Sequence, residues 1–253
     1  MTKKPFFNHA TRSIIKKELL HYFTTPLGYI FLIIFLFGIG NATFEIGKGN
    51  FFIQRQADLS SFFGYIPWMY IFLIPAITMR LWAEERKSGT IELLLTLPIT
   101  IPQAVISKFI ASWIFIGISL LCTFPMVLTV IYLGNPDLNV IFVGYIGAFL
   151  LGGVFLAIGS FFSALTKNQV ISFILTVVVS YTLLTAGSPP ILEMLSNLFP
   201  KYFLHLFESL SLLNHYEVLS NGVFRLSDLW FYSVLIIAWL LGSIEFLKYN
   251  RAN

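Results

Sequence analysis

Six long apolar runs limit what this 253-residue chain can fold into. In chain order they are Leu27–Phe44, Leu59–Leu81, Val105–Leu133, Val140–Leu165, Val170–Ala186 and Leu229–Leu247. A helix rises about 1.5 Å per residue, so these runs can cross roughly 30 Å of hydrocarbon, although the fifth is the shortest. Hydrophobic residues make up 57% of the chain and charged residues only 11%, which excludes an ordinary soluble domain. We therefore expect an all-α polytopic membrane protein with six transmembrane helices and a single domain over residues 1–253.

The distribution of lysine and arginine predicts how these helices are oriented. Six spans place both termini and every second loop on one side of the membrane. That side carries Lys3, Lys4, Arg12, Lys16, Lys17, Arg80, Arg86, Lys87, Lys108, Lys167, Lys248 and Arg251, whereas the other carries Lys48, Arg55, Lys201 and Arg225. Because basic residues accumulate on the cytoplasmic side of membrane proteins, both termini are predicted to be cytoplasmic.

Residues 1–26, which precede the first run, predict a helix that lies on the cytoplasmic leaflet. One face of this helix would carry Ile14, Ile15, Leu19, Leu20 and Phe23, and the opposite face Lys16, Lys17 and Glu18. Such a division is typical of an interfacial helix, which Pro26 would end. The segment is too long for the basic region of a cleaved signal peptide, so the mature protein is expected to keep it.

Charged residues are concentrated between the second and third runs, in the segment 83–104. Its core reads Glu84-Glu85-Arg86-Lys87-Ser88-Gly89-Thr90-Ile91-Glu92-Leu93-Leu94. Ions are costly in hydrocarbon, so this core must lie at a membrane face, where its charges and following leucines predict a short amphipathic helix. Gly89 would permit a turn, and Ser88 or Thr90 would cap the helix that follows. The alternative is an ordinary solvated loop.

Residues 187–228 predict an external pair of short helices that dip into the outer leaflet. Leucine and phenylalanine recur there at helical spacing in two runs that Pro200 separates. The stretch also contains four candidate ligands, His205, Glu208, His215 and Glu217. They form either a weak metal or proton site or an interfacial polar group without a ligand, because their spacing matches no familiar metal site.

Few other residues suggest chemistry. Ser172, Thr176 and Ser180 share one face of the fifth run, where they either face a substrate path or bond to their own backbone. The single cysteine, Cys122, excludes an internal disulfide and is expected to be a small buried residue. No phosphate-binding loop occurs, since Gly47-Lys48 lacks the upstream glycine. We expect no catalytic residue, no metal and no cofactor on this chain.

Three stretches, in chain order, resemble the permeases of type-2 ABC exporters. Lys16-Lys17-Glu18-Leu19-Leu20-His21-Tyr22-Phe23-Thr24-Thr25-Pro26 looks like their interfacial elbow helix. Trp82-Ala83-Glu84-Glu85-Arg86-Lys87-Ser88-Gly89-Thr90-Ile91-Glu92-Leu93-Leu94-Leu95-Thr96-Leu97-Pro98 closely resembles their coupling segment. The stretches 210–217 and 222–229 are similar to the signature before their last span. The gliding-motility-associated permease is the closest branch in character.

This resemblance implies a division of labour between subunits. ATP and Mg would bind to a separate cytoplasmic ATPase dimer, which moves the permease through the elbow helix and the coupling segment. The implied coupling residues are Glu84, Glu85, Arg86, Lys87, Ser88, Gly89, Thr90 and Glu92. A second permease, identical or different, would meet the first and fifth spans, toward which Ser172, Thr176 and Ser180 would point.

The resemblance also implies a location and a set of partners. The chain would be a multi-pass protein of the bacterial cytoplasmic membrane, surrounded by lipid. No nucleic-acid partner is expected, and a periplasmic accessory protein is left open. The sequence names no substrate.

Two other functions remain open at this point. A scaffold could use ATP hydrolysis to drive assembly of an envelope machine without transport. A membrane-embedded transferase could use His205, Glu208 and His215.

The first prediction concerns topology. Single cysteines introduced at Glu85 and Lys167 in a background lacking Cys122 should react only with reagents that reach the cytoplasm. Cysteines at Asp58 and Asn135 should react with impermeant reagents added from outside. Labelling of position 85 from outside would contradict the assignment.

Overall fold

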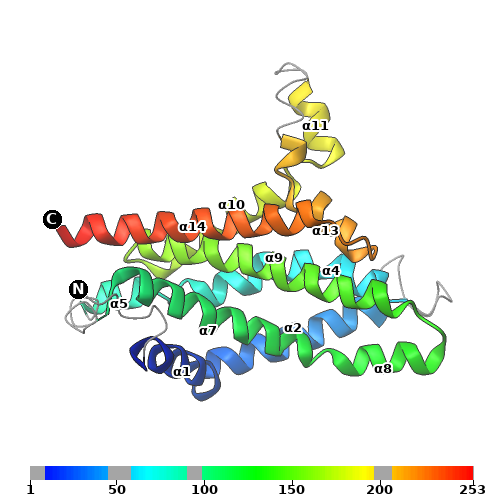
Figure 1. Cartoon of the computed structure of the whole chain (residues 1–253), viewed down its shortest axis with the longest axis horizontal. Coiled ribbons are helices and arrows are strands. Elements are labelled where there is room, and N and C mark those ends of the chain that lie inside the picture. The colour runs from blue at the N-terminus through cyan, green and yellow to red at the C-terminus, as the bar shows by residue number, and fades with distance from the viewer. Residues whose placement is uncertain (1–8, 45–57, 90–98, 197–206, 253) are drawn as a thin grey trace.

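A computed structural model describes residues 9–44, 58–89, 99–196 and 207–252, and every regular element in these ranges is an α-helix. The helices are α1 (His9–Thr24), α2 (Pro26–Phe44), α4 (Ser60–Thr78), α5 (Ala83–Ser88), α7 (Ile101–Leu121), α8 (Phe124–Leu133), α9 (Leu138–Leu165), α10 (Gln169–Thr185), α11 (Pro189–Ser196), α13 (Leu212–Ser220) and α14 (Leu226–Ala252). Most of the long helices lie side by side in one bundle (Figure 1). The predicted all-α class is therefore confirmed for these residues.

Within the residues that the structure describes, five helical segments are long and apolar enough to cross a membrane. They are Pro26–Phe44, Ser60–Ser88, Ile101–Leu133, Leu138–Leu165 and Leu226–Asn250. The fifth predicted span forms α10, an apolar helix of 17 residues that is shorter than these five. A count of six spans therefore stays a prediction.

The third predicted span is not one continuous helix. A capping box formed by Thr100 and Gln103 starts α7 at Ile101, and α7 ends at Leu121 before α8 begins. Thr123 occupies the break, where its hydroxyl donates to the Leu120 carbonyl at 2.6 Å. Pro125 follows in the first turn of α8, where its missing N–H costs no helical bond. Cys122 lies at this break and is exposed, so the prediction that it is buried was wrong.

The central helix of the bundle is α9. It lies against α4, α7, α10, α13 and α14, and most of its residues are buried. Small residues allow this close packing: a Cβ added at Gly144 would lie 2.6 Å from the ring of Phe63. Within a membrane such contacts supply van der Waals attraction between helices. The predicted role of the small residues in this span, which is close helix approach, is confirmed.

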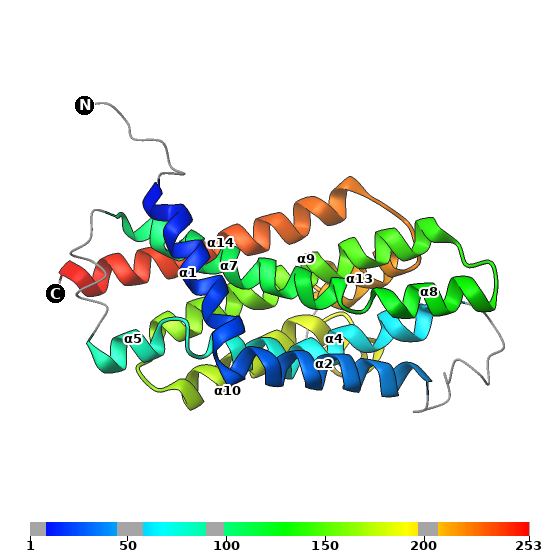
Figure 2. The ribbon, with the colours of Figure 1, turned by 90° about the horizontal axis from the view of Figure 1, so that it is seen from below.

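The bundle has two distinct ends. At one end α1 crosses the other helices steeply, near α5 and the C-terminal part of α14, whereas α8 and α13 lie at the other end (Figure 1, Figure 2). We call these the α5 end and the α13 end.

The predicted external pair of helices is only partly correct. The run predicted to form its second helix, residues 203–213, lies partly outside the described residues, and the helix that follows, α13, belongs to the bundle, where Leu212, Tyr216 and Leu219 are buried. The Tyr216 hydroxyl donates to the Phe63 carbonyl at 2.9 Å. The first helix, α11, projects away from the bundle (Figure 1). The intervening residues 197–206, with Pro200 and His205, lie outside the described residues.

The second prediction tests the contact between α4 and α9. A Cβ at Gly159 would lie 2.6 Å from the buried Cβ of Thr78, so Gly159→Ala should lower the free energy of unfolding by about 1–3 kcal/mol through overpacking. Gly64→Ala is the matched control, because nothing lies within 4 Å of its added Cβ. Thermal unfolding of the purified variants would measure the difference, and equal stability would contradict this packing.

Candidate functional site

The N-terminal end of α5 is fixed to the last turns of α9. The Ser163 hydroxyl accepts the backbone N–H groups of Trp82 at 3.0 Å and Ala83 at 3.1 Å, and donates to the Met79 carbonyl at 3.2 Å. The indole N–H of Trp82 donates to the Ser160 hydroxyl at 3.2 Å. Two serines of α9 thus hold the turn that leads from α4 into α5.

The C-terminal end of α5 is a left-handed turn. Gly89 has a φ of 74°, which confirms the predicted turn and explains a glycine there, because other side chains rarely adopt this conformation. The Ser88 hydroxyl donates to the Glu84 carbonyl at 2.8 Å. The helix therefore covers six residues and does not extend to Glu92. Thr90 and Glu92 lie outside the described residues.

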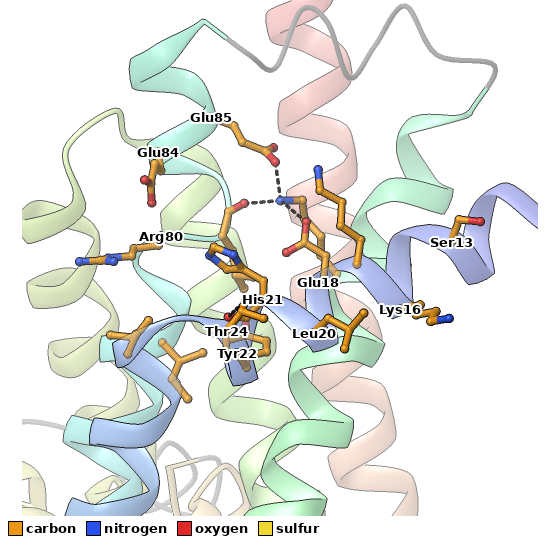
Figure 3. Close-up of a pocket in the computed structure, with 15 residues that line it drawn as sticks. Ser13, Lys16, Glu18, Leu20, His21, Tyr22, Thr24, Arg80, Glu84 and Glu85 are labelled. Carbon is orange, nitrogen blue, oxygen red and sulfur yellow. Dashed lines mark hydrogen bonds and ion pairs between the residues drawn. The ribbon is translucent and has the colours of Figure 1, made fainter.

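Lys108 of α7 connects α1, α5 and the turn after α4. Its Nζ donates to Glu85 Oε1 at 2.7 Å and to the Leu81 carbonyl at 2.8 Å, and it lies 3.3 Å from Glu18 Oε1. The side chain is only 3% exposed and lies 4.9 Å from the Trp82 ring centre. An ammonium group has three protons, and here three acceptors from three elements face it. We call Lys108, Glu18, Glu85 and the Leu81 carbonyl the Lys108 cluster; its contacts are dashed in Figure 3.

A second set of contacts attaches α1 to α7. The Tyr22 hydroxyl shares a 2.8 Å hydrogen bond with the Ser112 hydroxyl, and the Tyr22 ring stacks on Phe115 at 4.7 Å between centres. Burial raises the pKa of the Tyr22 phenol well above its ordinary value, so the hydroxyl stays protonated. The helix predicted to lie on the membrane surface is therefore also anchored within the protein.

A cleft of about 650 Å³ separates α1 from the end of α4 and α5 (Figure 3). Its lining comprises Ser13, Lys16, Lys17, Glu18, Leu20, His21, Tyr22, Thr24, Leu27, Ile77, Arg80, Leu81, Glu84, Glu85 and Lys108. Charged groups surround one part of it and apolar side chains another. The Lys108 cluster lies in the wall of this cleft, where α1 and α5 come together.

The predicted coupling residues divide into two groups. Glu84, Lys87 and Ser88 are exposed, whereas Glu85 and Arg86 turn inward. The Arg86 guanidinium donates to the Ala164 carbonyl and lies over the ring of Phe246, with Cζ 5.4 Å from its centre. Figure 3 shows Glu84 and Glu85 on different sides of α5.

The same division holds for the elbow residues predicted on α1. Lys16 and Lys17 are exposed, whereas Glu18 turns toward Lys108. Sequence reasoning missed Lys108, Ser160 and Ser163. Lys108 could have been found from the sequence, because it is a lysine within an otherwise apolar run. We counted it only as one of the basic residues that set the orientation.

The stripe of Ser172, Thr176 and Ser180 does not face outward. All three side chains are fully buried on α10, which lies against α9 and α4 of the same chain. The prediction that this face points to a subunit interface is therefore wrong for this structure. The Thr176 hydroxyl donates to the Ser172 carbonyl at 2.7 Å, as the packing alternative expects, whereas the buried hydroxyls of Ser172 and Ser180 have no hydrogen-bond partner among the described residues.

The candidate ligands near α13 do not form a metal site within the described residues. Glu208 and Glu217 are exposed, and His215 instead pairs with Asp228, with its Nδ1 2.6 Å from Oδ1. His205 lies outside the described residues.

The long apolar helices of the bundle are those of a multi-pass membrane protein, and a comparison with protein families identifies its class. The family model of the ABC-2 family transporter protein matches residues 12–246, nearly the whole chain. The chain therefore belongs to the ABC-2 transporter family, as a membrane permease subunit of an ABC transporter. Membership of this family implies association with an ABC ATPase and the lipid bilayer. A search of curated proteins found no significant match.

The third prediction tests the Lys108 cluster. Lys108→Met should lower the free energy of unfolding by about 2–3 kcal/mol, because it leaves two partly buried carboxylates without their shared cation. Lys248→Met is the matched control: its pair with Glu245 is exposed, so a loss of at most about 0.5 kcal/mol is expected. Thermal unfolding of both variants measures this, and equal losses would contradict a special role for Lys108.

Proposed function

We propose that α1 and α5 are the elbow helix and the coupling helix of an export permease. A separate cytoplasmic ATPase dimer binds and hydrolyses ATP with Mg, and its movement reaches the bundle through these two helices. The observation that carries the proposal is the Lys108 cluster, because one buried cation joins α1, α5 and α7. A displacement of α5 must therefore move α1 and α7 or break an ion pair.

The two faces of α5 suit this role. Glu84 and Lys87 are exposed and available to a soluble partner. Glu85 and Arg86 face the bundle, where they bond to Lys108 and the Ala164 carbonyl. We infer that Glu84 and Lys87 determine which partner binds and how it is aligned on α5. Glu85 and Arg86 then transmit the movement of that partner to the bundle.

The proposal includes a location and an assembly. Both termini and α5 lie on the cytoplasmic side of the bacterial inner membrane, in agreement with the bias of basic residues. Among the described residues, five helical segments have the length of a span, and α10, at 17 residues, serves as the sixth. A second permease completes the transporter.

Within the family, the charged segment and the stretch 210–229 favour a permease with the character of the gliding-motility branch. ATP-driven assembly of an envelope machine without transport would use the same joint. The family match to a transporter favours this role over a transferase.

The fourth prediction concerns docking of the ATPase. Glu84→Lys should weaken binding of the cognate ATPase by about tenfold, or about 1.4 kcal/mol, because the exposed carboxylate would face the partner with the wrong charge. Co-purification and ATP-driven activity of the assembled transporter measure the effect. The isolated chain should unfold at the wild-type temperature.

Two variants make this test specific. Glu193→Lys reverses an equally exposed charge on α11 and should leave ATPase binding unchanged. Glu85→Gln should instead lower the stability of the isolated chain, because Glu85 holds Lys108. Full association and full activity of Glu84→Lys would refute the proposed docking surface.

A further inference from the structure

A buried histidine–aspartate pair lies at the α13 end, far from the Lys108 cluster. Asp228, in the first turn of α14, is 3% exposed, and its Oδ1 lies 2.6 Å from Nδ1 of His215 on α13. The other ring nitrogen, Nε2, lies 3.2 Å from the Ser209 carbonyl. The imidazole also stacks on Phe231, with ring centres 3.9 Å apart.

Both nitrogens of His215 thus face hydrogen-bond acceptors. A neutral imidazole carries a single N–H, so it can donate to only one of the two oxygens. The imidazolium form donates to both and also supplies the positive charge that a buried carboxylate requires. Asp228 Oδ2 is buried without a hydrogen-bond partner among the described residues, and the ion-pair partner of Asp228 there is His215.

The pair closes a corner between two helices. The chain leaves α13 through a turn at Gly222, whose φ is 81°, and then enters α14. Tyr232 of α14 donates its hydroxyl to the Leu212 carbonyl at 3.1 Å, which ties α14 back to α13. The His215–Asp228 contact is the part of this corner that depends on a titratable proton.

Other charged groups near the corner are more exposed. Titratable side chains on the elements that surround His215 include Glu208 before α13, Glu217 on α13, Arg225 in the turn, Tyr232 on α14, Tyr65 and Tyr70 on α4, Tyr145 on α9 and Tyr181 on α10. Glu208, Glu217 and Arg225 are exposed to solvent, which screens their charge. Among the described residues, Asp228 is the charged side chain in contact with His215.

We propose that His215 and Asp228 form a pH-sensitive latch that fastens α13 to α14 while His215 is protonated. Histidine is the side chain that most readily changes charge between about pH 5 and 8. The protonated state holds the corner, and this contribution is lost as the pH rises and the imidazolium loses its proton. If the orientation given under the proposed function holds, the latch responds to the periplasmic pH.

The test uses the full chain in lipid nanodiscs without the ATPase. Hydrogen exchange of residues 209–228, corrected for the intrinsic pH dependence, is compared at pH 5.5 and 8.5. Wild-type protection should fall by about tenfold or more at the higher pH. His215→Gln, which cannot become charged, should be weakly protected at both pH values. His21→Gln, at the α5 end, should keep the wild-type response.

If His215→Gln fails to fold, the variant Asp228→Asn and a direct titration of His215 still test the proposal. Asp228→Asn should remove the pH response, because the neutral amide no longer favours the imidazolium. In wild-type protein labelled with ¹⁵N-histidine, the His215 signal should titrate along with the loss of protection. A wild-type pH response in Asp228→Asn, or a His215 that stays neutral from pH 5.5 to 8.5, would overturn the latch. These readouts do not involve the ATPase, so the latch and the transport function can fail separately.

Discussion

The arrangement of the α5 end depends on one buried positive charge. An ammonium group with 3% exposure is tolerated only if its protons are matched by acceptors, and Lys108 meets this requirement with two carboxylates and one carbonyl. Those acceptors belong to α1, to α5 and to the turn after α4. The positions of these elements are therefore linked to each other through a residue of a fourth element, α7. Under the proposed function, this link would pass a movement of the six-residue helix α5 to α1 and α7.

The helix α9 supports both ends of the molecule. At its C-terminal end Ser160 and Ser163 hold the turn into α5, and near its N-terminal end Gly222 of the α13–α14 corner packs on Val140. Between these points the small residues of α9 let neighbouring helices approach closely. In lipid, where apolar burial gives little advantage between helices, such packing and buried hydrogen bonds provide the attraction. A single well-packed helix thus connects the coupling joint with the corner at the other end.

Because the chain belongs to the ABC-2 family, we interpret the two ends of the bundle differently. At the α5 end, exposed charges form an outward surface and other residues bond to the bundle. Under the proposed function, the exposed charges bind the ATPase and the bonded residues transmit its movement. The α13 end also exposes charged residues, among them Glu208, Glu217 and Arg225. What distinguishes it is the buried pair of His215 and Asp228, together with an apolar helix, α11, that projects from the bundle.

The sequence by itself determined the all-α membrane class, the apolar helices, the small residues of α9 and the turn at Gly89, because length, hydropathy and backbone preference act locally. It also predicts that the charged segment lies outside the hydrocarbon. Only the tertiary structure decided that Lys108 joins Glu18 and Glu85, that Ser172, Thr176 and Ser180 face inward, and that His215 pairs with Asp228. Periodicity shows which residues share a face, but not which neighbour covers that face. Lys108 and Glu18 are 90 positions apart, and a polar side chain within a membrane bundle takes its role from whichever acceptor the packing of helices brings within reach.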